Sequence, residues 1–89
     1  MSLEYLKQHL AEQIANRRKR LGLSQKELAE KAKIGESTLG LIEQAKGNPA
    51  IETLDHIARA LGTDILELCP PKKGVITIDL NALEALRNK

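Results

Sequence analysis

Residues 25–44 read QKELAEKAKIGESTLGLIEQ, and this stretch decides the fold. Its apolar residues form two sets at helical spacing, which are Leu28, Ala29 and Ala32, then Leu39 and Ile42. A spacing of three or four residues places side chains on one face of a helix. Between the sets, we expect Gly35 to supply the backbone freedom that ends one helix and starts the next. Because Ala29 is small, the two helices can cross closely, and the pattern predicts a helix-turn-helix motif.

The flanking sequence extends this motif into an all-α fold of five helices. Gly22 is typical of a helix C-terminus, and Ser24 with Glu27 has the spacing of a capping box that opens the next helix. Thr63 or Asp64 can cap the fifth helix. The predicted helices are 3–21, 25–33, 36–46, 51–61 and 65–69. Their expected core-facing residues are Leu3, Leu6, Leu10, Ile14 and Leu21 in the first helix, and Leu54, Ile57, Ala58 and Leu61 in the fourth.

The sequence after Pro70 has a different character. Residues 75–80, VITIDL, are rich in β-branched side chains and predict a short strand, followed by a helix over 82–87. A lone strand leaves backbone groups unpaired, and antiparallel pairing with the same strand of a second copy would satisfy them. We therefore expect 70–89 to be a dimerisation element, and the alternative is a disordered tail. The dimerisation residues would be Val75, Ile76, Thr77, Ile78 and Leu80.

Composition narrows the class of protein. The 89 residues fit one domain, and a single cysteine, Cys69, fits a reducing compartment such as the cytoplasm. We expect no signal peptide and no membrane span, because no apolar run approaches about 20 residues. His9 and His56 have no Cys/His neighbours at metal-ligand spacing, and no glycine-rich phosphate loop is present. We therefore predict neither an enzyme nor a bound metal or cofactor.

Charge is unevenly distributed along the chain. Residues 17–33 hold seven Lys/Arg and two Glu, whereas residues 34–69 hold two Lys/Arg and six Asp/Glu. A basic segment in a chain whose net charge is only +2 indicates a surface that faces a polyanion. A solvated helix end is the alternative for Arg17 to Arg20, because cations suit the helix C-terminus. Beside a helix-turn-helix, whose second helix enters the DNA major groove, we prefer phosphate contacts by Arg17, Lys19 and Lys26.

At several spaced motifs the chain resembles the Cro/lambda-repressor-like (XRE) helix-turn-helix family. The matching residues are 21–25 (LGLSQ), 27–29 (ELA), 37–39 (STL), 42–43 (IE), 48–49 (NP), 52–54 (ETL) and 57–62 (IARALG). The resemblance covers 13–68 and implies a five-helix lambda-repressor-like DNA-binding domain. It does not cover the tail.

The resemblance also implies residue roles. Gln25 would touch a phosphate and brace the second helix of the motif, and Arg18 with Glu43 would form a partly buried ion pair. Base-facing and flanking positions would be Glu36, Ser37, Thr38, Gly40, Leu41 and Gln44, and backbone contacts would come from Lys46 and Asn48.

Two departures from the family pattern stand out. Lys33 and Ala45 occupy positions where relatives often have glycine, and a non-glycine residue can cost on the order of 1 kcal/mol there. Residues 36–46 also lack Arg at the base-facing positions. Glu36 can accept from a cytosine amino group and Leu41 can touch a thymine methyl, so specificity could be modest or could depend on DNA shape.

Three functions fit these observations. The first is a homodimeric transcriptional regulator, a repressor, that binds a palindromic operator in double-stranded DNA. The second is an antitoxin of the same fold that also docks a toxin kinase. The third is a protein-interaction module that no longer binds DNA.

Overall fold

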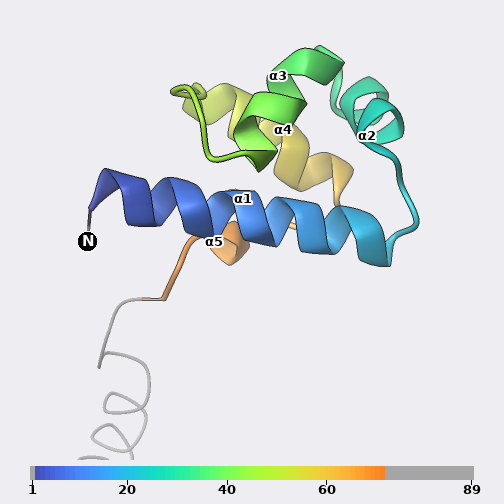
Figure 1. The fold of residues 1–89 in the computed structure, drawn as a ribbon. Helices are drawn as coiled ribbons and strands as arrows, with labels where there is room; N and C mark the ends of the chain where they lie inside the picture. Colours follow the sequence, from blue (N-terminus) through green and yellow to red (C-terminus); the bar gives the residue numbers. More distant parts are fainter. Residues whose placement is uncertain (1, 72–89) are drawn as a thin grey trace, which may run out of the picture.

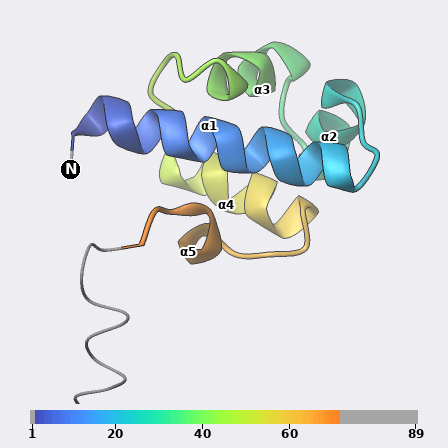
Figure 2. The same ribbon diagram turned by 60° about the horizontal axis from the view of Figure 1, so that its bottom comes forward.

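The computed structural model describes residues 2–71, and the regular structure in this part of the chain is α-helical. The helices are α1 (Leu3–Arg20), α2 (Gln25–Ala32), α3 (Glu36–Glu43), α4 (Ile51–Ala60) and α5 (Ile65–Leu68). Helix α1 runs across the domain, with α3 along one side and α5 on the other (Figures 1 and 2). The predicted order of five helices is confirmed. The strand and helix predicted after Pro70 lie outside the described residues.

Hydrogen bonds at the helix ends explain where the helices begin. The predicted capping box is present, because the backbone N–H of Glu27 donates to Ser24 Oγ at 3.0 Å and that of Ser24 donates to Glu27 Oε1 at 2.9 Å. Asp64, rather than Thr63, caps α5 by accepting from the backbone N–H of Glu67 at 3.0 Å. Gly22 has a φ of +72°, as a residue just after a helix C-terminus often does.

The core is aliphatic and follows the predicted faces. Its largest fully buried side chains are Ile14, Leu28, Leu39, Ile57 and Leu68. The predictions for Leu3 and Leu21 are wrong, because their side chains are 58% and 54% exposed. Leu3 lies in the first turn of α1, which extends past α3 and α4 (Figure 1), and Leu21 is the C-cap residue after the last turn.

The turn between α2 and α3 differs from the prediction. Gly35 has φ −71° and ψ 145°, an extended conformation that any residue adopts. Lys33 instead takes the left-handed conformation, with φ 60° and ψ 43°, and the backbone N–H of Ile34 then reaches Ala29 O at 2.9 Å. Ala45 has the same φ of 60°, which ends α3 at Glu43 instead of the predicted Lys46.

The helices within residues 2–71 are not suited to span a membrane. None of them combines the length and the apolar composition that crossing a bilayer requires.

Candidate nucleic-acid interface

Helix α3 has one buried and one exposed face. Leu39 and Ile42 are in the core, and Leu41 on the opposite face is 49% exposed. The exposed face borders a shallow surface hollow, here called the α2–α3 depression, which is lined by Gln25, Glu36, Ser37, Gly40, Leu41 and Gln44. Every one of these six residues belongs to the set that the sequence proposed for DNA contact. The fold therefore brings half of that set onto one concave surface.

A hydrogen-bond network fixes α3 to the rest of the domain. Arg18 on α1 donates twice to Glu43, from Nε to Oε2 at 2.8 Å and from Nη2 to Oε1 at 3.0 Å. Arg18 Nη1 also donates to the carbonyl oxygen of Leu23 at 2.8 Å, in the loop between α1 and α2. Gln25 at the start of α2 donates from Nε2 to Glu43 Oε1 at 3.1 Å. The structure thus contains the predicted contact between Arg18 and Glu43.

The electrostatics of this network favour the charged state of Arg18. Hydrogen bonding to Glu43 raises the pKa of the Arg18 guanidinium, burial opposes this effect, and the attraction of the Glu43 charge adds to it. The two side chains are 12% and 6% exposed. The guanidinium therefore stays ionised and is committed to holding α3, so it is not available for a phosphate.

The remaining candidate residues lie outside the α2–α3 depression. Lys19, Lys26, Thr38, Lys46 and Asn48 are exposed, whereas Arg17 is half-buried. The Nε atom of Arg17 is buried and has no hydrogen-bond partner among the described residues.

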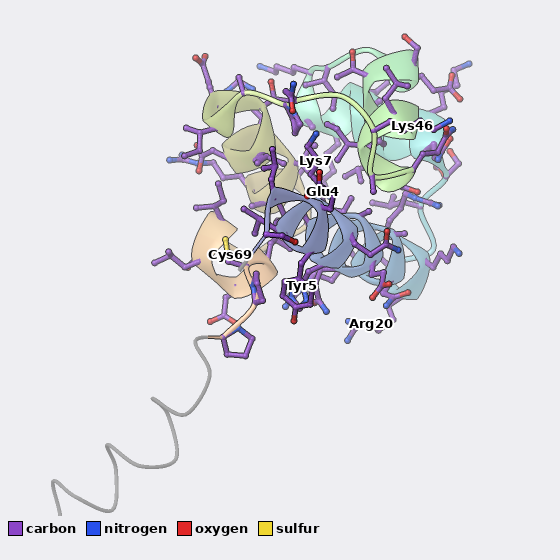
Figure 3. All side chains as sticks on the ribbon, turned by 60° about the vertical axis from the view of Figure 1, so that its left-hand side comes forward. Glu4, Tyr5, Lys7, Arg20, Lys46 and Cys69 are labelled. Atoms are coloured by element: carbon purple, nitrogen blue, oxygen red, sulfur yellow. The ribbon has the colours of Figure 1, made fainter. Side chains whose placement is uncertain are left out.

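Two of the basic residues, Lys46 and Arg20, lie on different sides of the domain. Lys46 projects beside α3, whereas Arg20 projects from the far end of α1 on another side of the domain (Figure 3). Arg20 therefore does not share a surface with Lys46 and α3.

Lys7 was missed by the sequence reasoning. It lines a small hollow together with Lys46 and Pro49, between α1 and the loop that follows α3 (Figure 3). The available signal was its spacing of three and seven residues from Leu10 and Ile14, which places it on the face of α1 that packs on the domain. Lys7 thereby adds a cation next to a position that the resemblance gives to DNA backbone contact.

Other chemically active groups are dispersed. Cys69 is a half-buried free thiol, and no three His, Cys, Asp or Glu side chains within residues 2–71 come together as metal ligands would.

Five helices with an exposed α3 fixed against α1 and α2 define a helix-turn-helix domain. The profile of the helix-turn-helix family matches residues 14–68, which is more than half of the chain. The chain belongs to this family, in its Cro/lambda-repressor-like (XRE) branch, as its motifs predicted.

The chain is similar to one curated protein and to two solved structures of regulators. An uncharacterised HTH-type transcriptional regulator from Methanothermobacter thermautotrophicus is 39% identical over 54 residues, which cover 61% of this chain and 78% of that protein. The structure resembles an HTH_3-family transcriptional regulator from Vibrio cholerae with a TM-score of 0.71 and 31% identity, over 75% of this chain but only 38% of that one. It also resembles the biofilm master regulator SinR, solved with DNA, with a TM-score of 0.62 and 35% identity, over 66% of this chain and 95% of SinR.

Proposed function

We propose that the chain binds double-stranded DNA sequence-dependently, as a homodimeric regulator that represses transcription in the cytoplasm. The observation that carries this proposal is the α2–α3 depression, where α3 exposes polar and apolar side chains on a helix anchored by Arg18 and Glu43. An exposed helix of this kind can enter the major groove, where each base pair has a distinct pattern of donors and acceptors. The likeness to SinR, which was solved with DNA, supports the proposal.

Within the depression, Ser37 and Leu41 are the proposed base-reading residues. Both lie on the exposed face of α3, and Leu41 offers an apolar surface to a thymine methyl. The proposed backbone contacts come from Lys26, Lys46 and Asn48, which are exposed, and from Arg17 and Lys19 on α1. Contacts to phosphates position the protein, whereas contacts to bases specify the site.

Dimerisation follows from the limited reach of one domain. A single α3 reads only a few base pairs, which is too little information to find a site among a genome's competitors. Two copies related by a two-fold axis would place their α3 helices about 34 Å apart, one turn of duplex. Residues 75–80 remain the proposed pairing segment.

The proposal is tested by selecting bound sequences from a pool of random duplexes. We expect enriched palindromic sites whose half-sites are about 10 base pairs apart. The variant Leu41→Gln should change the ranking of sites more than it changes binding to unselected duplexes, because each base contact is worth about 1–3 kcal/mol. A pool without enrichment would contradict sequence-dependent binding. An unchanged ranking for Leu41→Gln would remove Leu41 from the base-reading set.

A further inference from the structure

The side-chain amide of Gln25 has a fixed orientation. Its Nε2 donates to Glu43 Oε1 at 3.1 Å, and a carboxylate can only accept. Glu43 itself is held by two donors of Arg18. A flipped amide would place the Gln25 carbonyl oxygen against a carboxylate oxygen, and two acceptors repel. Glu43 therefore determines which end of the Gln25 amide faces outward.

The outward end is the carbonyl oxygen, which lies over Gly40. A Cβ atom built on Gly40 would be 4.0 Å from Gln25 Oε1, and both residues line the α2–α3 depression. Because Gly40 has no side chain, nothing on that residue covers the oxygen. None of the side-chain hydrogen bonds within residues 2–71 has Gln25 Oε1 as its acceptor. The depression thus presents Gln25 Oε1 as a free hydrogen-bond acceptor, and the hydrogen bond from Gln25 Nε2 to Glu43 fixes its position.

The other walls of the depression strengthen this bias toward acceptors. Glu36 contributes a carboxylate, Leu41 is apolar, and no Lys or Arg lines the surface. The Ser37 hydroxyl and the Gln44 amide can each donate or accept. In the major groove, guanine exposes two acceptors, N7 and O6, whereas adenine and cytosine each expose an amino group. Gln25 Oε1 and the Glu36 carboxylate can only accept, so they match an amino group and repel the acceptors on the guanine edge.

We propose that Gln25 Oε1 accepts a hydrogen bond from the exocyclic amino group of adenine or cytosine, and that it discriminates against guanine at that base. The inference rests on the proposed function, because it names the base chemistry read at the same surface. Glu43 is then a positioning residue for specificity as well as for the fold. The second N–H of the Gln25 amide stays free for the phosphate contact that the resemblance implies, so the two roles use different atoms.

The test uses the full chain and the duplex recovered by selection. N6-methyladenine or N4-methylcytosine is placed at single positions of the half-site, which replaces the major-groove amino hydrogen by a methyl group and keeps base pairing. At one position we expect binding by the wild type to weaken about tenfold, the scale of one base contact. The modified base that has this effect distinguishes adenine from cytosine.

Two variants of Gln25 complete the test. Gln25→Met keeps the length of the side chain and replaces the amide oxygen by a thioether, which is only a weak acceptor. The methyl group should therefore weaken binding by this variant much less than binding by the wild type, and Gln25→Ala should behave in the same way. The matched control Lys26→Met, at the next residue of α2, should weaken binding to all duplexes alike and keep the tenfold effect.

Two results would overturn the inference alone. One is an equal penalty of the methyl group in the wild type and in Gln25→Met. The other is an enriched site at which methylation of no adenine or cytosine weakens binding by the wild type. A pool without any enriched sequence would instead overturn the proposed function, and the inference with it.

Discussion

Arg18 and Glu43 join α1 to the last residue of α3 through two parallel hydrogen bonds, 2.8 Å and 3.0 Å long. Both side chains are largely buried, at 12% and 6% exposed. Glu43 also accepts from Gln25, so one carboxylate connects three helices. The orientation of the exposed face of α3 therefore depends on this pair.

Removing Arg18 should destabilise the domain strongly. We expect Arg18→Met to lower the free energy of unfolding by about 3 kcal/mol, because Glu43 would stay buried without its charged partner. Urea denaturation measures this change. The control is Arg59→Met, which breaks the exposed pair between Arg59 and Asp55 (3.0 Å; 77% and 39% exposed) and should cost less than about 1 kcal/mol. Equal losses in the two variants would show that the buried pair contributes no more to the free energy of unfolding than the exposed pair.

Replacing Lys33 by glycine should stabilise the domain. Lys33 has a φ of 60°, a conformation that costs a residue with a side chain about 1–2 kcal/mol. Glycine removes this strain, but it also raises the entropy of the unfolded chain, which offsets about 0.5–1 kcal/mol of the stabilisation. We expect a net gain of about 0.5 kcal/mol in urea denaturation. Lys31→Gly is the matched control, because it removes the same charge within α2 and should cost about 1 kcal/mol. A loss in both variants would argue against strain at Lys33.

Acid should weaken the start of α2 through Glu27. The pKa of Glu27 is below its ordinary value. The larger cause is the hydrogen bond that its carboxylate accepts from the backbone N–H of Ser24, and the smaller cause is its interaction with the Ser24 hydroxyl. The unfolded chain binds this proton more tightly, so the contribution of Glu27 is present near neutral pH and is lost as the pH falls through its folded pKa.

The melting temperature between pH 7 and pH 3 measures this dependence. Glu27→Gln should reduce the drop in melting temperature on acidification, whereas Glu30→Gln, on the exposed side of the same helix, should leave the wild-type drop. Identical profiles for all three proteins would contradict the role of Glu27.

Truncation after Pro70 tests the proposed dimerisation element. The buried core residues identified in the structure lie between Leu10 and Leu68, so the shortened chain should fold. Without 75–80 we expect it to be mostly monomeric by sedimentation and to bind palindromic sites much more weakly. An equally stable dimer would place the interface on the helices instead.

Local rules in the sequence predicted most of this architecture. The spacing of Leu28 from Ala32, that of Leu39 from Ile42 and the capping box of Ser24 depend on neighbours within about one helical turn, and these predictions are confirmed. The turn was placed wrongly at Gly35, because the propensity of glycine for a left-handed φ does not show which residue must adopt it. Lys33, the C-cap residue of α2, adopts that conformation instead, at the turn where α2 packs on α3.

The atomic arrangement of the candidate site was only partly predictable. The resemblance implied the pair of Arg18 with Glu43 and a bracing role for Gln25, but it did not name Glu43 as the partner of Gln25, which lies 18 positions away. No local pattern encodes such a contact, since it depends on how α2 and α3 cross. Helical periodicity could have predicted the side-chain direction of Lys7, which lines the hollow beside Lys46. A single lysine outside any motif, however, gives no sign in the sequence that it belongs to a site.

The salt dependence of duplex binding tests the central claim most directly. Each phosphate contact contributes a slope of about −0.9 to the logarithm of affinity against the logarithm of salt concentration. We predict that Arg17→Glu, Lys19→Glu and Lys26→Glu each weaken binding to all duplexes and flatten this slope by about one unit, with the smallest effect for half-buried Arg17. Arg59→Glu, an exposed charge on α4, should leave the slope unchanged. Unchanged affinity and slope in all three variants would contradict DNA binding through the phosphate contacts proposed for α1 and α2.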